Sequence, residues 1–423
     1  MRTNLRLGDQ GVGVQLLQLA LNRGGFRTEI DGIFGPETCR NVQAFFRTSD
    51  ACNITEKEWE QLIPFIKGYV DYKVQKGDTL WRIAEAYRTN VARIISANPG
   101  IQPEFLQIGD VIRLPFAFPV VSTQVNTTSE LVEYEIDGLL VRYPFLKKER
   151  IGRSVMGKDI NCIRIGTGPI EIFYSATYHA NEWITTPVLL KFLEDYAECY
   201  LKGRMLGTES ALSLYRRYSL YIVPLVNPDG VDLVNGVLDD EEYLEEAEEI
   251  ADEFPEIRFP AGWKANIEGI DLNLQFPAGW EDARRIKYAQ GYTMPAPRDF
   301  VGEAPLVAPE SKAIYDFTRM HDFRLVLAYH TQGKVIYWKY KDYTPMNAED
   351  IAEEFARVSG YKIAETPGES ANAGYKDWFI QEYDSPGYTI EAGIGENPLS
   401  LQQFPEIYKN NFGILLGGMI NIL

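Results

Sequence analysis

Residues 170–182 read IEIFYSATYHANE, a nearly continuous apolar run that ends just before His179 and Glu182. Further apolar runs lie at 219–226, 323–329 and 388–390, and helical patterns lie at 186–200 and 309–320. Near-continuous apolar strands that alternate with helices are typical of a sheet covered by helices on both faces. The sequence therefore predicts an α/β domain with a mixed sheet flanked by helices.

Two of the chain's three histidines and two carboxylates stand where apolar runs end. These residues are His179, Glu182, His330 and Glu391. If the runs are neighbouring strands, their ends meet at one edge of the sheet. A catalytic zinc takes three such protein ligands and leaves a fourth position for water. On spacing alone, ordinary strand-end histidines explain the pattern equally well.

The chain's 423 residues are too many for one ordinary core, so two or three domains are expected. A formal net charge of −18 argues against a nucleic-acid groove, which needs clustered Lys and Arg. The sequence has no signal-peptide pattern and no run of about 18 apolar residues, so we expect no membrane insertion. The expected location is cytoplasmic or spore-associated, with access to the cell wall after release.

The four cysteines show no metal-binding or dense disulfide pattern. They are Cys39, Cys52, Cys162 and Cys199, without CxxC spacing. We therefore expect four free thiols. The acidic stretch 239–249 is expected to be a solvated helix or loop, because runs of like charge usually lie on the surface.

Residues 4–67 carry two amphipathic helical patterns, 12–22 and 37–46, around a loop with an Asp-Gly turn and Pro36 at a helix start. Three strings stand out: LGDQG at 7–11, DGIFGPET at 31–38, and the apolar positions Val42, Phe45 and Phe46. Through these strings the segment resembles the peptidoglycan-binding domain found beside many wall hydrolases. We therefore expect a small all-α domain over residues 1–68.

The next segment opens with YKVQKGDTLWRIA at 72–84 and closes with LQIGDVIRLP at 106–115. A strand, a helix capped by Asp78 or Thr79, a second helix near 91–98 and a closing strand give a βααβ order. The segment resembles a LysM domain, a module that binds the N-acetylglucosamine part of peptidoglycan or chitin. The resemblance implies a small α+β LysM domain over residues 70–116, with peptidoglycan or muropeptides as partners.

Six strings of the remaining sequence occur in one family's order. They are HANE at 179–182, PLVNPDG at 224–230, GIDLN at 269–273, YHT at 329–331, DW at 377–378 and YTIE at 388–391. Residues 127–423 thereby resemble the zinc carboxypeptidase (carboxypeptidase A) family. By this resemblance His179, Glu182 and His330 bind one Zn²⁺ per chain. Asp271 matches a carboxylate that orients the first histidine, a common outer-shell device.

The resemblance also implies catalytic roles. Glu391 matches the general base that takes a proton from the attacking water and passes it to the leaving nitrogen. Lys264 follows Trp263 where the digestive enzymes have Trp-Arg, so it matches the arginine that stabilises the oxyanion. A lysine keeps the charge but loses the planar bidentate fork. A solvated surface lysine is the alternative for Lys264.

The sequence departs from the family where substrate is bound. The family's Asn-Arg pair holds the substrate's C-terminal carboxylate, but here Asn273 is followed by Leu274. Lys376 stands where the family lines the pocket of the leaving residue, and a cation there suggests an acidic leaving residue. The alternative is a lysine that points to solvent. Tyr375 is the nearest match to the family's substrate-capping tyrosine, although it lies too close to Asp377.

With two wall-binding domains ahead of the peptidase domain, these departures resemble the branch of γ-D-glutamyl-meso-diaminopimelate peptidase I. We therefore expect a zinc metallopeptidase that hydrolyses the γ-D-glutamyl–meso-diaminopimelate bond of peptidoglycan stem peptides. Two alternatives stay open. One is a zinc carboxypeptidase that trims the C-terminal residue of stem peptides, and the other is a wall-binding protein with a degenerate peptidase domain.

Overall fold

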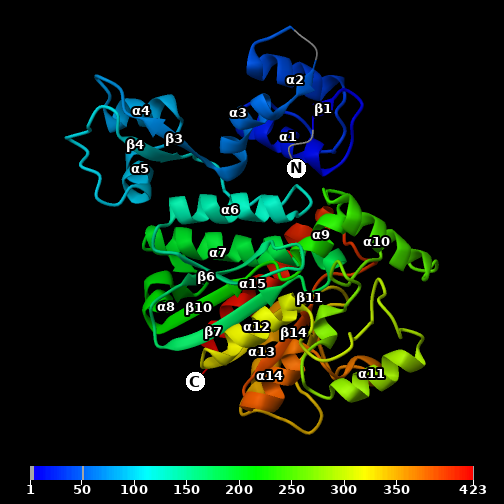
Figure 1. The fold of residues 1–423 in the computed structure, drawn as a ribbon. Coiled ribbons are helices and arrows are strands. Elements are labelled where there is room, and N and C mark those ends of the chain that lie inside the picture. The colour runs from blue at the N-terminus through cyan, green and yellow to red at the C-terminus, as the bar shows by residue number, and fades with distance from the viewer. Residues whose placement is uncertain (1–3, 50–51, 423) are drawn as a thin grey trace. The chain divides into compact units, whose positions relative to one another are not determined.

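The computed structural model describes residues 4–49 and 52–422 (Figure 1). The chain divides into two compact units, one comprising residues up to 126 together with 130–147, the other comprising 127–129 and residues from 148 onward. In the described part of the chain, no helix combines the length and the apolar character that crossing a bilayer requires.

The first unit begins with a small helical part. Its elements are β1 (Leu5–Arg6), α1 (Val12–Arg23), α2 (Pro36–Phe46), β2 (Asn53–Ile54) and α3 (Glu56–Lys67). The buried side chain of Gln18 on α1 donates to Asp31 Oδ1 at 2.7 Å and accepts from Gly32 N at 2.9 Å. These bonds fix the loop before α2, whose first residue is Pro36, as predicted from the sequence.

The cysteine prediction is wrong for two of the four residues. Cys39 on α2 and Cys52 beside β2 form a disulfide, with their Cα atoms 5.4 Å apart. The chain after α2 returns to pair β2 with β1, and this return brings the two cysteines within bridging distance. Cys162 and Cys199 are free.

The next part of the first unit has the predicted βααβ order. Its elements are β3 (Tyr69–Lys73), α4 (Leu80–Ala86), α5 (Val91–Ala97) and β4 (Val111–Pro115). Strands β3 and β4 pair antiparallel. Thr79 and Asn90 cap the two helices, because their side chains accept from Arg82 N and Arg93 N at 3.2 and 2.9 Å. This arrangement confirms the predicted α+β module.

Helix α6 (Ser129–Arg142) is grouped largely with the first unit. Its Glu135 side chain accepts from Ser122 N at 2.6 Å, and Arg142 Nη2 donates to Phe116 O at 2.9 Å. The domain limits inferred from the sequence, 1–68, 70–116 and 127–423, stay predictions.

The second unit has a large sheet. Its strands are β5 (Lys147–Arg153), β6 (Asp159–Ile165), β7 (Ile170–Ala176), β10 (Tyr218–Val223), β11 (Phe323–His330), β12 (Val335–Tyr337), β13 (Lys362–Ala364) and β14 (Gly387–Glu391), in the spatial order β13-β12-β14-β11-β7-β10-β6-β5. Strands β14, β11, β7 and β10 run parallel, whereas β6 and β12 pair antiparallel with their inner neighbours. The sheet is therefore mixed, as predicted.

Helices and short elements lie between these strands or follow β14, the last of them (Figure 1). They are η1 (Ala180–Glu182), α7 (Thr185–Leu201), β8 (Met205–Leu206), β9 (Glu209–Ser210), α8 (Ala211–Arg217), α9 (Pro228–Val234), α10 (Glu241–Asp252), η2 (Leu272–Leu274), α11 (Trp280–Ala289), α12 (Pro309–Arg319), α13 (Ala348–Ser359), η3 (Gly368–Ser370), α14 (Tyr375–Tyr383), η4 (Leu401–Gln403) and α15 (Phe404–Ile420). The acidic stretch forms the mostly exposed helix α10.

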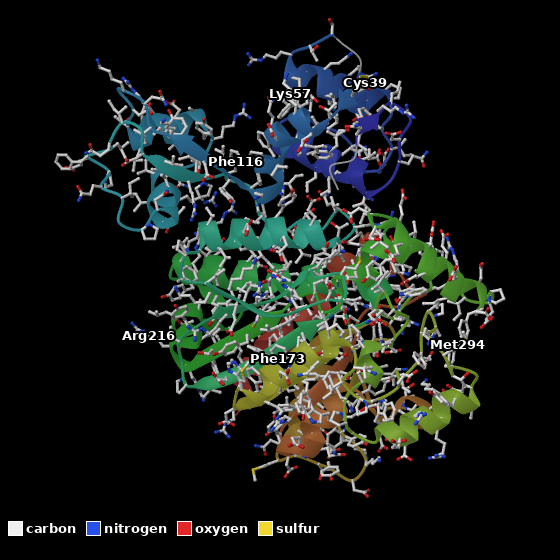
Figure 2. All side chains as sticks on the ribbon, viewed as in Figure 1. Cys39, Lys57, Phe116, Phe173, Arg216 and Met294 are labelled. Carbon is white, nitrogen blue, oxygen red and sulfur yellow. A yellow bond between two sulfur atoms is a disulfide. The ribbon has the colours of Figure 1, made fainter. Side chains whose placement is uncertain are left out.

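Successive residues of β7 show that both faces of the sheet are covered. The ring of Phe173, labelled in Figure 2, lies 5.7 Å from Phe317 of α12 and 5.9 Å from Tyr375 of α14. The next residue, Tyr174, points to the opposite face, where its hydroxyl donates to Leu415 O of α15 at 2.7 Å. Both side chains are fully buried, which is why β7 reads as an apolar run.

Candidate metal centre

The carboxyl ends of three neighbouring parallel strands meet at one edge of the large sheet. In the register of β11 with its neighbours, Tyr329 lies opposite Ala176 of β7, and His330 lies opposite Glu391 of β14. The sequence prediction that these apolar runs are adjacent strands is confirmed. The register brings His330 and Glu391 side by side although 60 residues separate them in the chain.

A single tight turn brings His179 and Glu182 together. His179 is extended, and the 3₁₀ turn η1 follows it directly. Residues three apart in such a turn lie on the same side, so His179 Nδ1 and Glu182 Oε1 are 3.0 Å apart. A bond from Ala180 N to Lys264 O, 3.0 Å long, ties the turn to a neighbouring loop.

His330 completes a buried cluster with this pair. Its Nδ1 lies 3.0 Å from Glu182 Oε2 and 3.2 Å from His179 Nδ1. One ligand atom from each residue lies within 4.8 Å of the others. Two ring nitrogens that face each other and one carboxylate favour a cation between them. Three nitrogen and oxygen ligands are also the usual protein set of a catalytic zinc, so the site fits zinc.

The charges of the cluster support the same conclusion. Burial opposes a charge on His179, but the Glu182 and Asp271 carboxylates outweigh it and raise the pKa of His179 to about 9. Burial also opposes ionisation of Glu182, yet His179 and Lys264 hold the pKa of this carboxyl well below its usual value. Burial lowers the pKa of His330. At neutral pH the metal-free cluster therefore holds a proton on His179 that a metal must displace.

Asp271 lies where the sequence predicted an orienting carboxylate. Its Oδ1 is 3.1 Å from His179 Nε2, the ring nitrogen that faces away from the cluster. The backbone amides of Asn273 and Asp299 donate to the same carboxylate at 3.1 and 3.2 Å. The two amides fix the carboxylate, and the carboxylate in turn fixes the ring of His179 with Nδ1 directed at the cluster.

Glu391 ends β14 beside the cluster. Burial and the nearby charge of Glu182, only partly offset by Lys264 and His179, raise the pKa of Glu391 to about 8. A cation bound at the cluster would lower this pKa toward neutrality. A carboxyl that titrates near neutrality suits a group that must both accept and donate a proton.

Lys264 is not a solvated surface lysine. Its ammonium nitrogen lies 3.0 Å from Glu182 Oε1, and its side chain is 18% exposed. Burial opposes the charge, but Glu182 outweighs it and raises the pKa of Lys264. The group is therefore a fixed positive charge beside the cluster.

The predicted substrate-binding residues Asn273 and Lys376 line one pocket together with Leu274, the two histidines and Glu391. Lys376 is 3% exposed, so the alternative of a lysine in solvent is wrong. Its ammonium lies 2.5 Å from Asp377 Oδ1 and donates to Lys339 O at 2.8 Å. The lysine charge is thus paired but faces the pocket.

The assignment of Tyr375 to substrate binding is wrong. Its side chain is fully buried between the sheet and α14, and its hydroxyl lies 3.0 Å from Thr318 Oγ1 on α12. Tyr375 begins α14 directly after Gly374, so its ring enters the core rather than the pocket. Only its backbone amide reaches a pocket residue, because Tyr375 N donates to Asn273 Oδ1 at 3.1 Å.

Further residues line the same pocket and were not found from the sequence. Among them are Lys287, Arg298, Asp299 and Tyr337. None of these four follows a long apolar run or belongs to a motif string. The adjacent Arg-Asp pair at 298–299 is the only local signal, and such pairs are common on protein surfaces.

The chain is a zinc metallopeptidase, because the buried zinc-type ligand set at the carboxyl edge of its mixed sheet coincides with a family match. The model of the zinc carboxypeptidase family matches residues 132–412, and that of the LysM domain matches residues 72–115. The chain belongs to the zinc carboxypeptidase family, whose cofactor is zinc, and it carries a LysM domain.

The chain is similar to proteins of known and unknown activity. It is 44% identical over 405 residues to gamma-D-glutamyl-L-diamino acid endopeptidase 1 of Lysinibacillus sphaericus, covering 83% of this chain and 100% of that protein. It is 41% identical over 287 residues to the uncharacterized protein YqgT of Bacillus subtilis (strain 168), covering 67% and 74%. The structure of bovine thrombin-activatable fibrinolysis inhibitor shares the fold, with a TM-score of 0.54, 16% identity and coverage of 71% and 98%.

Proposed function

We propose that this zinc metallopeptidase hydrolyses the amide bond between γ-D-glutamate and meso-diaminopimelate in peptidoglycan stem peptides. The observation that carries the proposal is the 44% identity to a gamma-D-glutamyl-L-diamino acid endopeptidase over 405 residues. That similarity is longer than the 132–412 match of the peptidase family, so it also includes part of the N-terminal unit.

The pocket supports an endopeptidase rather than a carboxypeptidase. Leu274 lines the pocket where an arginine would hold a C-terminal carboxylate, and an apolar side chain offers such a group no hydrogen bond. Lys376 faces the same pocket. We propose that it lies near the side-chain carboxylate of diaminopimelate, whose charge would add to that of Asp377 around the ammonium.

The proposed roles of the catalytic residues follow from their positions. Zinc held by His179, Glu182 and His330 would polarise the scissile carbonyl and activate the attacking water. Glu391 takes a proton from that water and delivers it to the leaving nitrogen. Lys264 places a fixed positive charge where negative charge develops on the carbonyl oxygen.

We propose that the LysM domain and the small helical part of the first unit bind peptidoglycan and take part in cell-wall degradation. Two weak interactions with a repeating polymer would raise the local concentration of the catalytic unit near its substrate. The Cys39–Cys52 disulfide supports action outside the reducing cytoplasm, because disulfides persist in oxidising compartments.

The test is digestion of L-Ala-γ-D-Glu-meso-diaminopimelate, followed by mass spectrometry. The wild type should release L-Ala-γ-D-Glu, and Glu391→Gln should lower kcat by about 10²- to 10⁴-fold. Glu353→Gln, which changes an exposed glutamate of α13, is the matched control and should act as the wild type. A stem tetrapeptide, with one residue after diaminopimelate, is digested in parallel. If the wild type removed only the last residue of this tetrapeptide, the protein would be a carboxypeptidase. If the zinc-loaded wild type cut neither peptide, the protein would be a degenerate enzyme.

A further inference from the structure

A second hollow adjoins the pocket described above. It is lined by Asn181, Glu256, Ile257, Gly262, Thr331, Gln332, Gly395, Glu396 and Asn397, and it shares Lys264, Arg298, Tyr337 and Glu391 with the first pocket. The four shared residues therefore lie at the junction of the two hollows. An amide bond placed beside Glu391 would have its leaving side in the pocket of Lys376 and its acyl side in the second hollow.

Arg298 belongs to a cluster of two cations and two carboxylates, because the charge of Asp271 also acts on Arg298 and Lys287. Asp299 bonds to both cations, with Oδ1 at 2.5 Å from Lys287 Nζ and Oδ2 at 2.5 Å from Arg298 Nε. No other hydrogen bond of the Arg298 guanidinium is found among the described residues. Its two terminal nitrogens thus present the planar edge that binds carboxylates in pairs.

The backbone at Asp299 is left-handed. Its φ of 67° lies in a region that aspartate adopts more readily than most residues other than glycine. The conformation directs Asp299 N to Asp271 Oδ2, while the side chain receives both cations. The orienting carboxylate of the metal centre and the guanidinium are therefore fixed by the same residue.

The charged groups that line the second hollow are two cations, Lys264 and Arg298, and three carboxyl groups, those of Glu256, Glu391 and Glu396. Lys264 is bonded to Glu182, so Arg298 is the cation with a free hydrogen-bonding edge. In a γ-linked glutamate, Cγ, Cβ and Cα separate the α-carboxylate from the scissile carbonyl carbon. Most α-linked residues carry no carboxylate on the acyl side, although an α-linked glutamate holds its side-chain carboxylate at the same spacing. An anion on the acyl side of the cut bond is therefore a feature of this substrate class.

We infer that Arg298 is a specificity-determining residue that binds the free α-carboxylate of the γ-linked D-glutamate. The inference rests on the proposed function. It assigns the carboxylate on the acyl side to Arg298 and the diaminopimelate side chain to the pocket of Lys376, so separate cations bind the two sides of the cut bond.

The test compares two tripeptides that differ in one group: L-Ala-γ-D-Glu-meso-diaminopimelate and its analogue with the D-glutamate α-carboxylate amidated. The zinc-loaded wild type should show a kcat/KM about 100-fold higher for the acid than for the amide, the factor expected when a charged hydrogen-bond partner is lost. Arg298→Gln should remove this preference by losing activity on the acid while keeping the activity on the amide. Arg298→Lys should give an intermediate ratio.

Activity on the amide shows that the variant is folded, and Arg285→Gln, an exposed arginine of α11, is the matched control. A wild type that cuts both peptides equally would overturn the inference, as would an equal loss by Arg298→Gln on both. A third tripeptide, amidated on diaminopimelate instead of D-glutamate, tests the leaving side. If Arg298→Gln abolished the preference of the enzyme for the acid over this amide, Arg298 would lie on the leaving side and the inference would also be overturned. If the wild type cuts none of these peptides, the proposed function itself is wrong.

Discussion

The metal-free protein already fixes His179 for metal binding, but with a proton on it. The carboxylates of Glu182 and Asp271 raise the pKa of His179 to about 9, whereas burial lowers that of His330. A metal replaces the proton on one histidine only. The Glu182 carboxylate, whose pKa is lowered, is ionised before the metal arrives.

Zinc binding at pH 7 should therefore release the proton of His179 and part of the proton of Glu391, whose pKa of about 8 the bound cation lowers. Calorimetric titration of the metal-free protein in buffers of different ionisation enthalpy measures this number. Apparent zinc affinity should rise with pH up to about 9. Asp271→Asn, which removes one of the two carboxylates beside His179, should release fewer protons and weaken zinc binding by about 10- to 100-fold. If the substitution left the number of released protons unchanged, Asp271 would not be a cause of the raised pKa of His179.

Glu310 gives a stability prediction away from the metal. It is fully buried at the start of α12, where it accepts from Val155 N at 3.1 Å and from Asn266 Nδ2 at 3.2 Å. Burial and the nearby Asp229 raise its pKa from 4.5 to about 7. The folded state thus holds a proton that the unfolded state has lost between these two pH values, so stability falls as pH rises.

The expected loss is about 3 kcal/mol between the unfolded and the folded pKa. Glu310→Gln cannot titrate, so the stability of the wild type relative to this variant should fall by about that amount over the same interval. Urea unfolding of both proteins across the pH range measures the difference. Parallel stability curves would show that Glu310 is ionised in the folded protein at neutral pH.

At the scale of elements, the sequence predicted best where burial is continuous. The runs 170–177 and 323–329 became β7 and β11, and the helical patterns 186–200 and 309–320 became α7 and α12. The strands β12 and β13 have three residues each and mixed burial. Such short segments show no hydrophobic periodicity from which a strand could be predicted.

The residues of the site were likewise predictable from the sequence only where they belong to long buried elements. The metal cluster was predictable because His330 ends β11 and the His179–Glu182 turn follows β7, and neighbouring parallel strands align their carboxyl ends. Arg298 and Asp299 lie in the long connection between α11 and α12, where tertiary contacts and a left-handed backbone at Asp299 set their positions. Tyr375 was misassigned because proximity in sequence to Asp377 says nothing about which side of α14 its ring takes.

Close packing of α15 on the sheet depends on a glycine. A Cβ added at Gly418 would clash with the hydroxyl of Tyr174, which donates to Leu415 O. Gly418→Ala should therefore lower the free energy of unfolding by about 2 kcal/mol, although alanine favours the helix by about 1 kcal/mol. In a Tyr174→Phe background the nearest ring carbon is 3.1 Å away, so the same substitution should cost less than about 1 kcal/mol. Equal costs in both backgrounds, measured by thermal or urea unfolding, would rule out this contact.

At the scale of the whole molecule, we expect the binding modules to act on the glycan polymer and the catalytic unit to act on the peptide. The LysM domain exposes large apolar side chains, with Trp81 64% and Phe105 68% exposed, whereas the metal cluster is buried in the second unit. Binding to a polymer raises the local concentration of the enzyme only when the cut peptide is attached to that polymer. A free tripeptide gains nothing from the modules.

Soluble N-acetylglucosamine oligomers should therefore slow digestion of insoluble peptidoglycan by the full-length enzyme and leave hydrolysis of the free tripeptide unchanged. Trp81→Ala should reproduce this selective loss, since avidity gains of about 10²-fold or more depend on both partners staying engaged. Released peptides, measured at matched enzyme concentrations, give both rates, and Tyr343→Ala, which removes an exposed aromatic ring of the second unit, is the control. If oligomers slowed both substrates equally, sugar would be binding at the catalytic pocket, and if they slowed neither, the N-terminal unit would not direct this enzyme to the glycan.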